Sequence, residues 1–358
     1  MIIQRDFSPL RYLRLHPGLS LEGGVIAPTS RVLLASAFAA MAEARPSRRT
    51  VLIPSFICST LVDAVIAAGL VPSFYGIGDN LSYLGEDIDV ALRKDPLALV
   101  FVDFFGLPAR PERQLLESAK AREVMLVRDG AHAFLSLMAA PHDPLQYADL
   151  AVFSIHKALR LGAGAIGFGA NVEVCPGMRR FPVLRGATKA HLRQLLRRRL
   201  SSKVDTVALK QLAPQPIAGL HQRLEFSSSI LRGFLRHVNF IALIEDVRVC
   251  AESIAREVAG SGELEAVFDE NRRSEGVLQW FPVNGKSQQS RDELVFELRS
   301  HGIDAHLWPH FSNMSVDTTL WSRLALLPIH PSVPLALKRM RLLKEGSSKI
   351  SEAPADKS

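Results

Sequence analysis

The sequence predicts an α/β protein: a three-layer α/β/α large domain on a mostly parallel sheet, with a smaller C-terminal α/β domain. Short β-rich apolar runs alternate with amphipathic helical segments through the first half of the chain, a pattern typical of parallel strands joined by helical crossovers. The chain has 358 residues, of which 47% are hydrophobic, enough for two cores. No apolar run reaches the roughly 18 residues that a membrane-spanning helix needs. We therefore expect a soluble protein without a transmembrane segment.

The individual elements of the first half follow from local signals. Helices are expected at 31–41, 59–68 and 111–122, and strands at 51–53, 71–74, 97–105, 124–127 and 150–153. Thr29 or Ser30 can cap the first helix, whose alanine and leucine content favours helix. Pro54 ends the first strand, Gly69 ends the second helix, and Gly106 closes the long buried strand.

The second half of the chain is less regular. We expect the large domain over residues 1–235, the small domain over residues 236–345, and a tail over residues 346–358. The small domain is inferred from helical patterns at 230–259 and 291–301 and from a strand near 276–281. The tail is rich in Ser, Lys, Glu, Ala and Pro, so we expect it to be disordered.

Cysteine usage and the N-terminus indicate a cytoplasmic protein. Cys58, Cys175 and Cys250 are widely spaced and odd in number, which favours neither a disulfide framework nor a metal site. Residues 1–17 contain charges and no uninterrupted apolar core, so they do not resemble a secretory signal.

The net charge of +7 is concentrated in the segment 176–203, which holds 9 basic residues, among them Arg197, Arg198 and Arg199, and no acidic residue. A charge run of this kind is often a solvated helix face and loop. It could also dock a diphosphate-bearing substrate, an acidic partner or a membrane surface. Nucleic acid is not expected, because interleaved aromatics and known binding motifs are missing.

Polar residues stand at the carboxyl ends of two predicted strands. Asp129 and His132 follow one strand, and Ser154 and Lys157 follow the next. The carboxyl ends of parallel strands open into a common crevice, so these residues could converge on one ligand. Arg128 points to the opposite side of its strand, where we expect a surface residue or one that lies behind the site.

These residue types are those needed to hold pyridoxal 5'-phosphate. A lysine amine forms a Schiff base with the cofactor aldehyde, and the ring then stabilises a carbanion. A carboxylate such as Asp129 keeps the ring nitrogen protonated, because an opposite charge favours the charged form. Ser154 and the start of the first helix, from Thr29 to Arg31, could bind the phosphate.

Each residue alone also has an ordinary structural explanation. A single aspartate after a strand is usually a turn or cap residue, a single histidine is usually structural, and Ser-x-x-Lys occurs by chance. Their ordered occurrence within one α/β frame favours the cofactor site.

At the level of whole segments, the sequence resembles the DegT/DnrJ/EryC1/StrS family of aminotransferases, from about residue 28 to about residue 330. The segment 129–133 is similar to the family signature Asp-x-Ala-Gln/His-Ala, and 148–154 is similar to the segment leading into the catalytic lysine. Weaker similarities lie at 51–56, 62–69, 102–106, 219–224 and 327–330. The resemblance implies a PLP-dependent transferase of fold type I.

The resemblance also implies roles for individual residues. Lys157 would bind the cofactor covalently and carry protons, and Asp129 would pair with the ring nitrogen. His132 would lie against the cofactor ring or its phenolic oxygen. Members of the family are homodimers whose active sites are shared between subunits.

The phosphate would be held by residues from separate parts of the chain. Ser154 would contact it directly, and Ser30 and Arg31 would contribute backbone N–H groups. His221, in the segment similar to a family stretch near the neighbouring phosphate, stands where an asparagine is expected.

Two further departures from the family concern the cofactor ring and the lysine. Cys58 stands where an aromatic residue is common, so ring stacking would depend on His132 or Phe56. The spacing from Ser154 to Lys157 is shorter than in many members, although a Ser-x-x-Lys form also occurs among relatives.

The resemblance implies an enzyme that transfers an amino group from an amino acid donor, such as glutamate, to a keto group of a sugar-like, nucleotide-linked substrate. Such a reaction belongs to amino-sugar or polysaccharide biosynthesis. Two alternatives stay open: a PLP-dependent sugar dehydratase, and a non-catalytic protein of the same fold that binds an anionic partner through the segment 176–203. Relatives known for dehydration carry histidine in place of the lysine, and Lys157 argues against that reaction.

Overall fold

The computed structural model describes part of the chain, and the fold rests on that part. The described residues are 12, 23–78, 80–139, 143–159, 161, 163–169, 228–307 and 323–351. The basic segment 176–203, the family-like segment 219–224 and His221 lie outside them.

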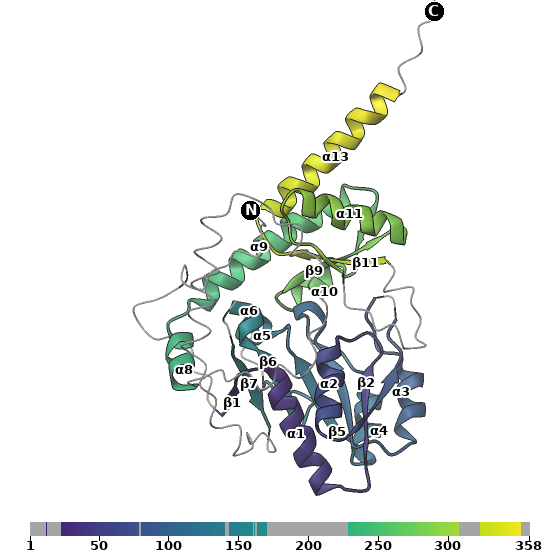
Figure 1. Cartoon of the computed structure of the whole chain (residues 1–358), viewed down its shortest axis with the longest axis vertical. Coiled ribbons are helices and arrows are strands. Elements are labelled where there is room, and N and C mark those ends of the chain that lie inside the picture. Colours follow the sequence, from purple (N-terminus) through teal and green to yellow (C-terminus); the bar gives the residue numbers. More distant parts are fainter. Residues whose placement is uncertain are drawn as a thin grey trace, which may run out of the picture.

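The larger sheet is mostly parallel, as the sequence predicts. Its strands are β1 (Val25–Ala27), β2 (Thr50–Pro54), β3 (Val71–Tyr75), β4 (Ala98–Val102), β5 (Met125–Gly130), β6 (Leu150–Ser154) and β7 (Ala165–Phe168). They lie in the order β1-β7-β6-β5-β4-β2-β3. Neighbours from β6 to β3 pair in parallel, whereas β7 is antiparallel to both β6 and β1. The fold class is therefore confirmed (Figure 1).

Helices cover both faces of this sheet. They are α1 (Ser30–Ala44), α2 (Ser59–Ala67), α3 (Gly85–Leu92), α4 (Arg113–Ala121), α5 (Phe134–Ala139) and α6 (Ile155–Leu159). Along β2, Val51 and Ile53 are buried in the hydrophobic cluster that contains α1 and α2. Leu52, between them, is buried in a second cluster with α3 and α4. This alternation is expected for a strand buried on both faces, and it produces three layers.

Local signals explain where α1 begins and where β4 ends. The side chain of Thr29 accepts a hydrogen bond from the backbone N–H of Val32 at 3.4 Å, so Thr29 is the N-cap and Ser30 the first helical residue. The strand expected to reach Phe105 ends at Val102. Beyond it, Phe105 and Gly106 turn the chain with positive φ values of 56° and 110°.

The smaller sheet is antiparallel and lies above the larger one in Figure 1. Its order is β10-β11-β9-β8, formed by β8 (Leu264–Ala266), β9 (Trp280–Gly285), β10 (His306–Leu307) and β11 (Leu324–Pro328). The nearby helices are α8 (Ser228–Arg236), α9 (Phe240–Ala259), α10 (Glu270–Ser274), α11 (Gln288–Ser300) and α13 (Ser332–Ser351). The strand expected near 276–281 lies later in the chain, as β9. Helix α13 continues past Gly346, into the segment where the sequence indicates disorder.

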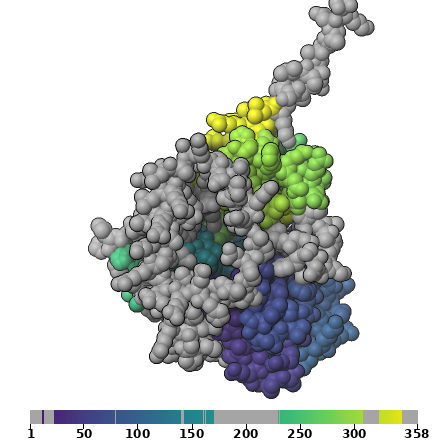
Figure 2. Space-filling model, viewed as in Figure 1, coloured from purple at the N-terminus to yellow at the C-terminus, as the bar shows by residue number. Residues whose placement is uncertain are grey.

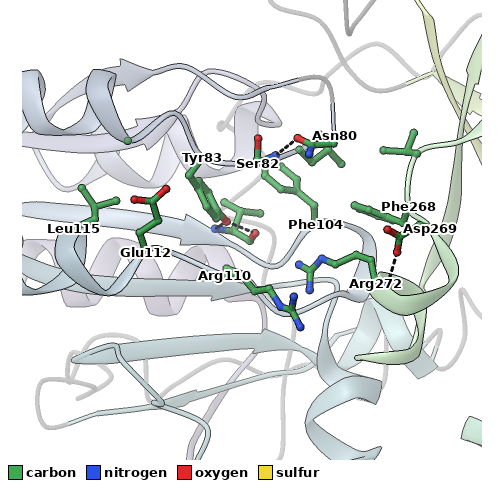
Figure 3. A pocket seen from close by; sticks show the side chains of 15 residues that line it. Asn80, Ser82, Tyr83, Phe104, Arg110, Glu112, Leu115, Phe268, Asp269 and Arg272 are labelled. Carbon is green, nitrogen blue, oxygen red and sulfur yellow. Dashed lines mark hydrogen bonds between the residues drawn. The ribbon is translucent and has the colours of Figure 1, made fainter.

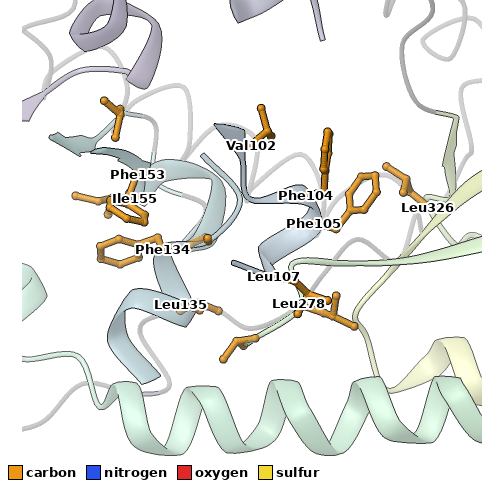
Figure 4. Packing of buried hydrophobic residues seen from close by; sticks show 14 of the residues in the cluster. Val102, Phe104, Phe105, Leu107, Phe134, Leu135, Phe153, Ile155, Leu278 and Leu326 are labelled. Carbon is orange, nitrogen blue, oxygen red and sulfur yellow. The ribbon is translucent and has the colours of Figure 1, made fainter. Parts of the chain in front are cut away.

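The turn Phe104–Gly106 joins the two sheets through direct hydrogen bonds. The backbone N–H of Gln279 donates to the carbonyl of Phe105 at 2.6 Å. The hydroxyl of Ser136 accepts from the N–H of Val277 at 2.7 Å and donates to the carbonyl of Gly106. Figure 4 shows the rings of this turn among buried side chains of both sheets, which share one hydrophobic core.

A buried ion pair between Arg128 and Asp103 holds the residue that directly precedes the same turn. The guanidinium of Arg128 donates to the carboxylate of Asp103 at 2.9 Å, and both side chains are almost completely buried. The carboxylate also accepts from the N–H of Ala109 at 2.7 Å. Of the two expectations for Arg128, a surface position is wrong, because the residue is buried. A position behind the site agrees with the structure, in which Arg128 lies on the face opposite Asp129, as the strand alternation requires.

The first prediction concerns the turn. Gly106→Ala would place a Cβ atom 2.2 Å from the carbonyl oxygen of Val277 and 2.9 Å from the nitrogen of Gln279, at a φ of 110°. We expect the free energy of unfolding, measured by urea denaturation, to fall by roughly 2–4 kcal/mol. The matched control is Gly233→Ala, since an added Cβ in α8 meets no atom of the described residues within 4 Å and alanine favours helix. Equal stability of the two variants would contradict this account of the turn.

The second prediction concerns the ion pair. Arg128→Met leaves the Asp103 carboxylate buried without its cation, and should cost roughly 3–5 kcal/mol of unfolding free energy near neutral pH. Burial raises the pKa of Asp103 above its ordinary 3.8, and Arg128 opposes that rise. The variant therefore raises this pKa further.

The sign of the pH dependence follows from this shift. A carboxyl whose pKa is higher in the folded state stabilises the fold below its unfolded pKa and loses that contribution as pH rises. The stability difference between wild type and Arg128→Met should thus be small near pH 3.8 and grow as pH rises. Arg128→Met with Asp103→Asn should recover most of the loss. A pH-independent difference, or no recovery in the double variant, would argue against a charge-based cause.

Candidate active site

The candidate site is centred on Lys157, which lies in α6 directly after β6. Its Nζ atom is 3.4 Å from Nε2 of His132, a residue of the turn between β5 and α5. Both side chains are half-buried. The structure therefore brings together the lysine and the histidine that the sequence placed after neighbouring strands.

Asp129 lies on the neighbouring strand at the same edge of the sheet. It pairs in register with Val152 of β6, and its side chain is buried at 6% exposure. One carboxylate oxygen accepts from the N–H of Ala131 at 3.0 Å. Burial raises the pKa of Asp129, and the positive charge of Lys157 lowers it. A buried carboxylate in this position is stabilised by any further cation placed next to it, such as a protonated ring nitrogen.

Phe105, a residue not singled out from the sequence, supports His132. The two rings stack with centroids 6.1 Å apart and an interplanar angle of 19°. Phe56, a predicted cofactor residue, is fully buried and packs its ring against Phe104 and Phe105 at 5.6 and 6.5 Å. Phe56 thus contacts Phe105, and Phe105 in turn stacks on His132. The aromatic-glycine pattern of 102–106 was the available sequence signal for Phe105.

The sequence predicts that the N-terminus of α1 binds the phosphate, and the structure describes the residues there. The hydroxyl of Ser30 is buried and has no hydrogen-bond partner among the described residues. Arg31 follows it in the first turn and is half-buried. First-turn N–H groups lack acceptors within a helix and attract anions. The unpartnered hydroxyl, beside such N–H groups, fits a phosphate.

Ser154 lies at the same level of the sheet as the start of α1. Ala165 of β7 pairs with Ser154 on one side and with Ala27 on the other, and Ala27 closely precedes the helix. The side chain of Ser154 is fully buried, and its Oγ atom lies 2.9 Å from Nδ1 of His156. The side chains of Lys157, Asp129, Ser30 and Ser154 are thus an amine, a buried carboxylate and two hydroxyls. These chemical groups fit pyridoxal phosphate.

Figure 2 shows teal atoms, from the part of the chain that contains β5 and β6, below the green small-sheet region and beside the blue large-sheet region. His221 and the segment 176–203 lie outside the described residues, so their predicted contributions stay predictions.

A cavity of about 290 Å³ lies beside this site, between the loop before α3 and helix α10. It is lined by Tyr83, Phe104, Arg110 and Arg272 among others (Figure 3), and by none of the predicted cofactor residues. Three of its polar side chains are engaged with protein atoms: the Tyr83 hydroxyl bonds both backbone groups of Val102, and Arg110 and Arg272 both pair with Glu275. The predicted cofactor site is therefore the group around Lys157 and not this cavity.

The described residues contain neither a metal-binding cluster nor a membrane-spanning helix. No group of three or more His, Cys, Asp or Glu side chains there could hold a metal ion. No helix in that part of the chain has the length and apolar character needed to cross a membrane.

Comparison with solved structures shows the same fold in several aminotransferases. The structure is similar to NtdA from Bacillus subtilis with bound cofactor PMP, at a TM-score of 0.62 and 14% identity, covering 92% of this chain and 73% of that one. It is similar to Helicobacter pylori PseC, at 0.60 and 11%, covering 96% and 100%. An aminotransferase from Brucella abortus matches at 0.57 and 15%, covering 90% and 85%.

Comparison at the level of sequence establishes the family. A search of curated proteins finds no match to this chain. The model of the DegT/DnrJ/EryC1/StrS aminotransferase family matches residues 32–325, which is most of the chain. The chain therefore belongs to the DegT/DnrJ/EryC1/StrS family of PLP-dependent aminotransferases.

Proposed function

We propose that this enzyme transfers an amino group from glutamate to a keto group of a sugar-like, nucleotide-linked acceptor. The observation that supports it most is the convergence of Lys157, His132 and Asp129, with 3.4 Å between the lysine and histidine nitrogens. The sugar acceptor is supported by relatives of the same fold: PseC is involved in the biosynthesis of pseudoaminic acid. CalS13 from Micromonospora echinospora is a sugar aminotransferase, similar at a TM-score of 0.58 and 14% identity.

The cofactor would be held at three points. Lys157 would bind it covalently, Asp129 would face the ring nitrogen, and Ser30, Arg31 and Ser154 would bind the phosphate. When bound, the cofactor supplies an electron-withdrawing ring that stabilises negative charge on the carbon that bears the amino group. Asp129 supports this function by favouring the protonated ring nitrogen.

Lys157 would also move the proton in both halves of the reaction. A general base must lie within hydrogen-bond reach of the proton that it takes, and Lys157 sits at the end of β6, on the same sheet edge as Asp129. His132, stacked on Phe105, can exchange a hydrogen bond with the lysine nitrogen and so orient it. The buried surroundings of Asp129 and Ser154 keep water from the charged groups.

Subunit organisation and location complete the proposal. We propose a cytoplasmic homodimer in which His221 reaches the neighbouring active site. The segment 176–203 would lie near the acceptor's diphosphate, because its basic side chains match that charge.

The third prediction tests the covalent role of Lys157. Purified protein with pyridoxal phosphate should show visible absorbance that borohydride bleaches, and Lys157→Ala should lack it, because the attaching amine is gone. Lys120→Ala, at an exposed position in α4, is the matched control and should behave as wild type.

The same preparation tests the amino donor. Adding glutamate to wild-type protein should remove the visible absorbance without borohydride, and Lys157→Ala should transfer no amino group to any acceptor. A wild-type protein that cannot be loaded with pyridoxal phosphate would contradict the proposed function. Retained absorbance with glutamate, but loss with another amino acid, would overturn only the choice of donor.

A further inference from the structure

His156, between Ser154 and Lys157, makes an unusual set of contacts for a residue outside the predicted site. Its Nδ1 atom lies 2.9 Å from Oγ of Ser154 and 3.2 Å from the carbonyl oxygen of Gly164. Its backbone N–H donates to the same carbonyl at 2.9 Å. The imidazole therefore connects the end of β6 with the residue just before β7.

The contacts favour one tautomer of the ring. A carbonyl oxygen can only accept, so the contact with Gly164 favours a proton on Nδ1, which is then shared between that carbonyl and Oγ of Ser154. Burial and the adjacent charge of Lys157 lower the pKa of His156 to about 4, so the ring is neutral at pH 7 and this proton is its only one. Oγ of Ser154 then accepts from Nδ1–H. Its own O–H is left to donate to another acceptor.

The same network reaches the N-terminus of α1. The backbone N–H of Gly164 donates to the carbonyl of Pro28 at 2.7 Å, and Pro28 directly precedes the N-cap Thr29. Gly164 has a φ of 135°, a conformation that glycine adopts readily. The hydroxyl of Ser30, which lacks a partner among the described residues, lies just beyond. His156 thus links the two elements that would hold the phosphate.

We propose that His156 is a positioning residue: its Nδ1–H group orients the Ser154 hydroxyl as a hydrogen-bond donor to the cofactor phosphate and ties that serine, through Gly164, to the start of α1. The inference rests on the proposed phosphate role of Ser154. It adds a residue that touches neither the cofactor ring nor the substrate and acts through Ser154.

The test compares two cofactor forms and two variants. Pyridoxal lacks the phosphate but carries the aldehyde that reacts with Lys157, so the ratio of its affinity to that of pyridoxal phosphate isolates the phosphate contribution. His156→Phe keeps a planar ring and removes the N–H, whereas His156→Asn retains an amide N–H near the position of Nδ1. Apo-protein is titrated with each compound, and visible absorbance gives the dissociation constants.

We expect His156→Phe to weaken pyridoxal phosphate binding by about 10- to 100-fold, the range for a lost hydrogen bond to a charged group, and to leave pyridoxal binding unchanged. His156→Asn should bind pyridoxal phosphate within about threefold of wild type, because it restores the donor. The pyridoxal titration also shows whether each variant is folded around Lys157.

Three results would overturn the inference while leaving the proposed function intact: wild-type phosphate affinity in His156→Phe, an equal loss for both compounds, or no recovery in His156→Asn. A wild-type protein that binds neither compound would instead overturn the proposed function, and the inference with it.

Discussion

The parallel pairing of β4, β5 and β6 is the constraint on which the rest of the molecule depends. Val102 pairs with Asp129, and Asp129 pairs with Val152, so the three strands end at the same edge. Polar residues that are far apart in sequence therefore meet there. The flanking helices cover both faces of the sheet. The carboxyl ends of the strands are not covered in this way, so a ligand can reach the polar side chains there.

Burial of two carboxylates at this edge creates an electrostatic problem that the strand alternation solves. Asp103 and Asp129 are both buried, and the charge of Asp103 raises the pKa of Asp129. Arg128 points to the opposite face from Asp129 and neutralises Asp103. Asp129 is then left to interact with Lys157 and, in the proposed function, with the cofactor ring. The Arg128–Asp103 pair therefore stabilises the fold, and Asp129 is the carboxylate proposed for the cofactor site.

Much of the site could be predicted because its residues follow regular strands. Asp129, Ser154 and Lys157 stand after apolar runs whose period and length identify buried strands. Asp103 stands after such a run too, and strand-end position was an available signal for it. Its partner Arg128 was harder to interpret, because the sequence does not reveal that Asp103 on the neighbouring strand pairs with it in the interior.

Other features depend on contacts between distant segments. The turn at Phe105 has a positive φ, and Gln279, just before β9, bonds to it; no local pattern encodes that contact. The tautomer of His156 depends on Gly164 of the following hairpin. Strands β1 and β7 are short, and they are defined by the pairing of β7 with both β1 and β6, which local propensity predicts poorly.

We propose that the cofactor is attached to Lys157, and peptide mapping identifies the attachment site directly. The protein loaded with pyridoxal phosphate is reduced with borohydride, digested, and examined by mass spectrometry for the peptide that carries the reduced cofactor. We expect the modification on Lys157 alone. A modification on another lysine, with Lys157 unmodified, would contradict it.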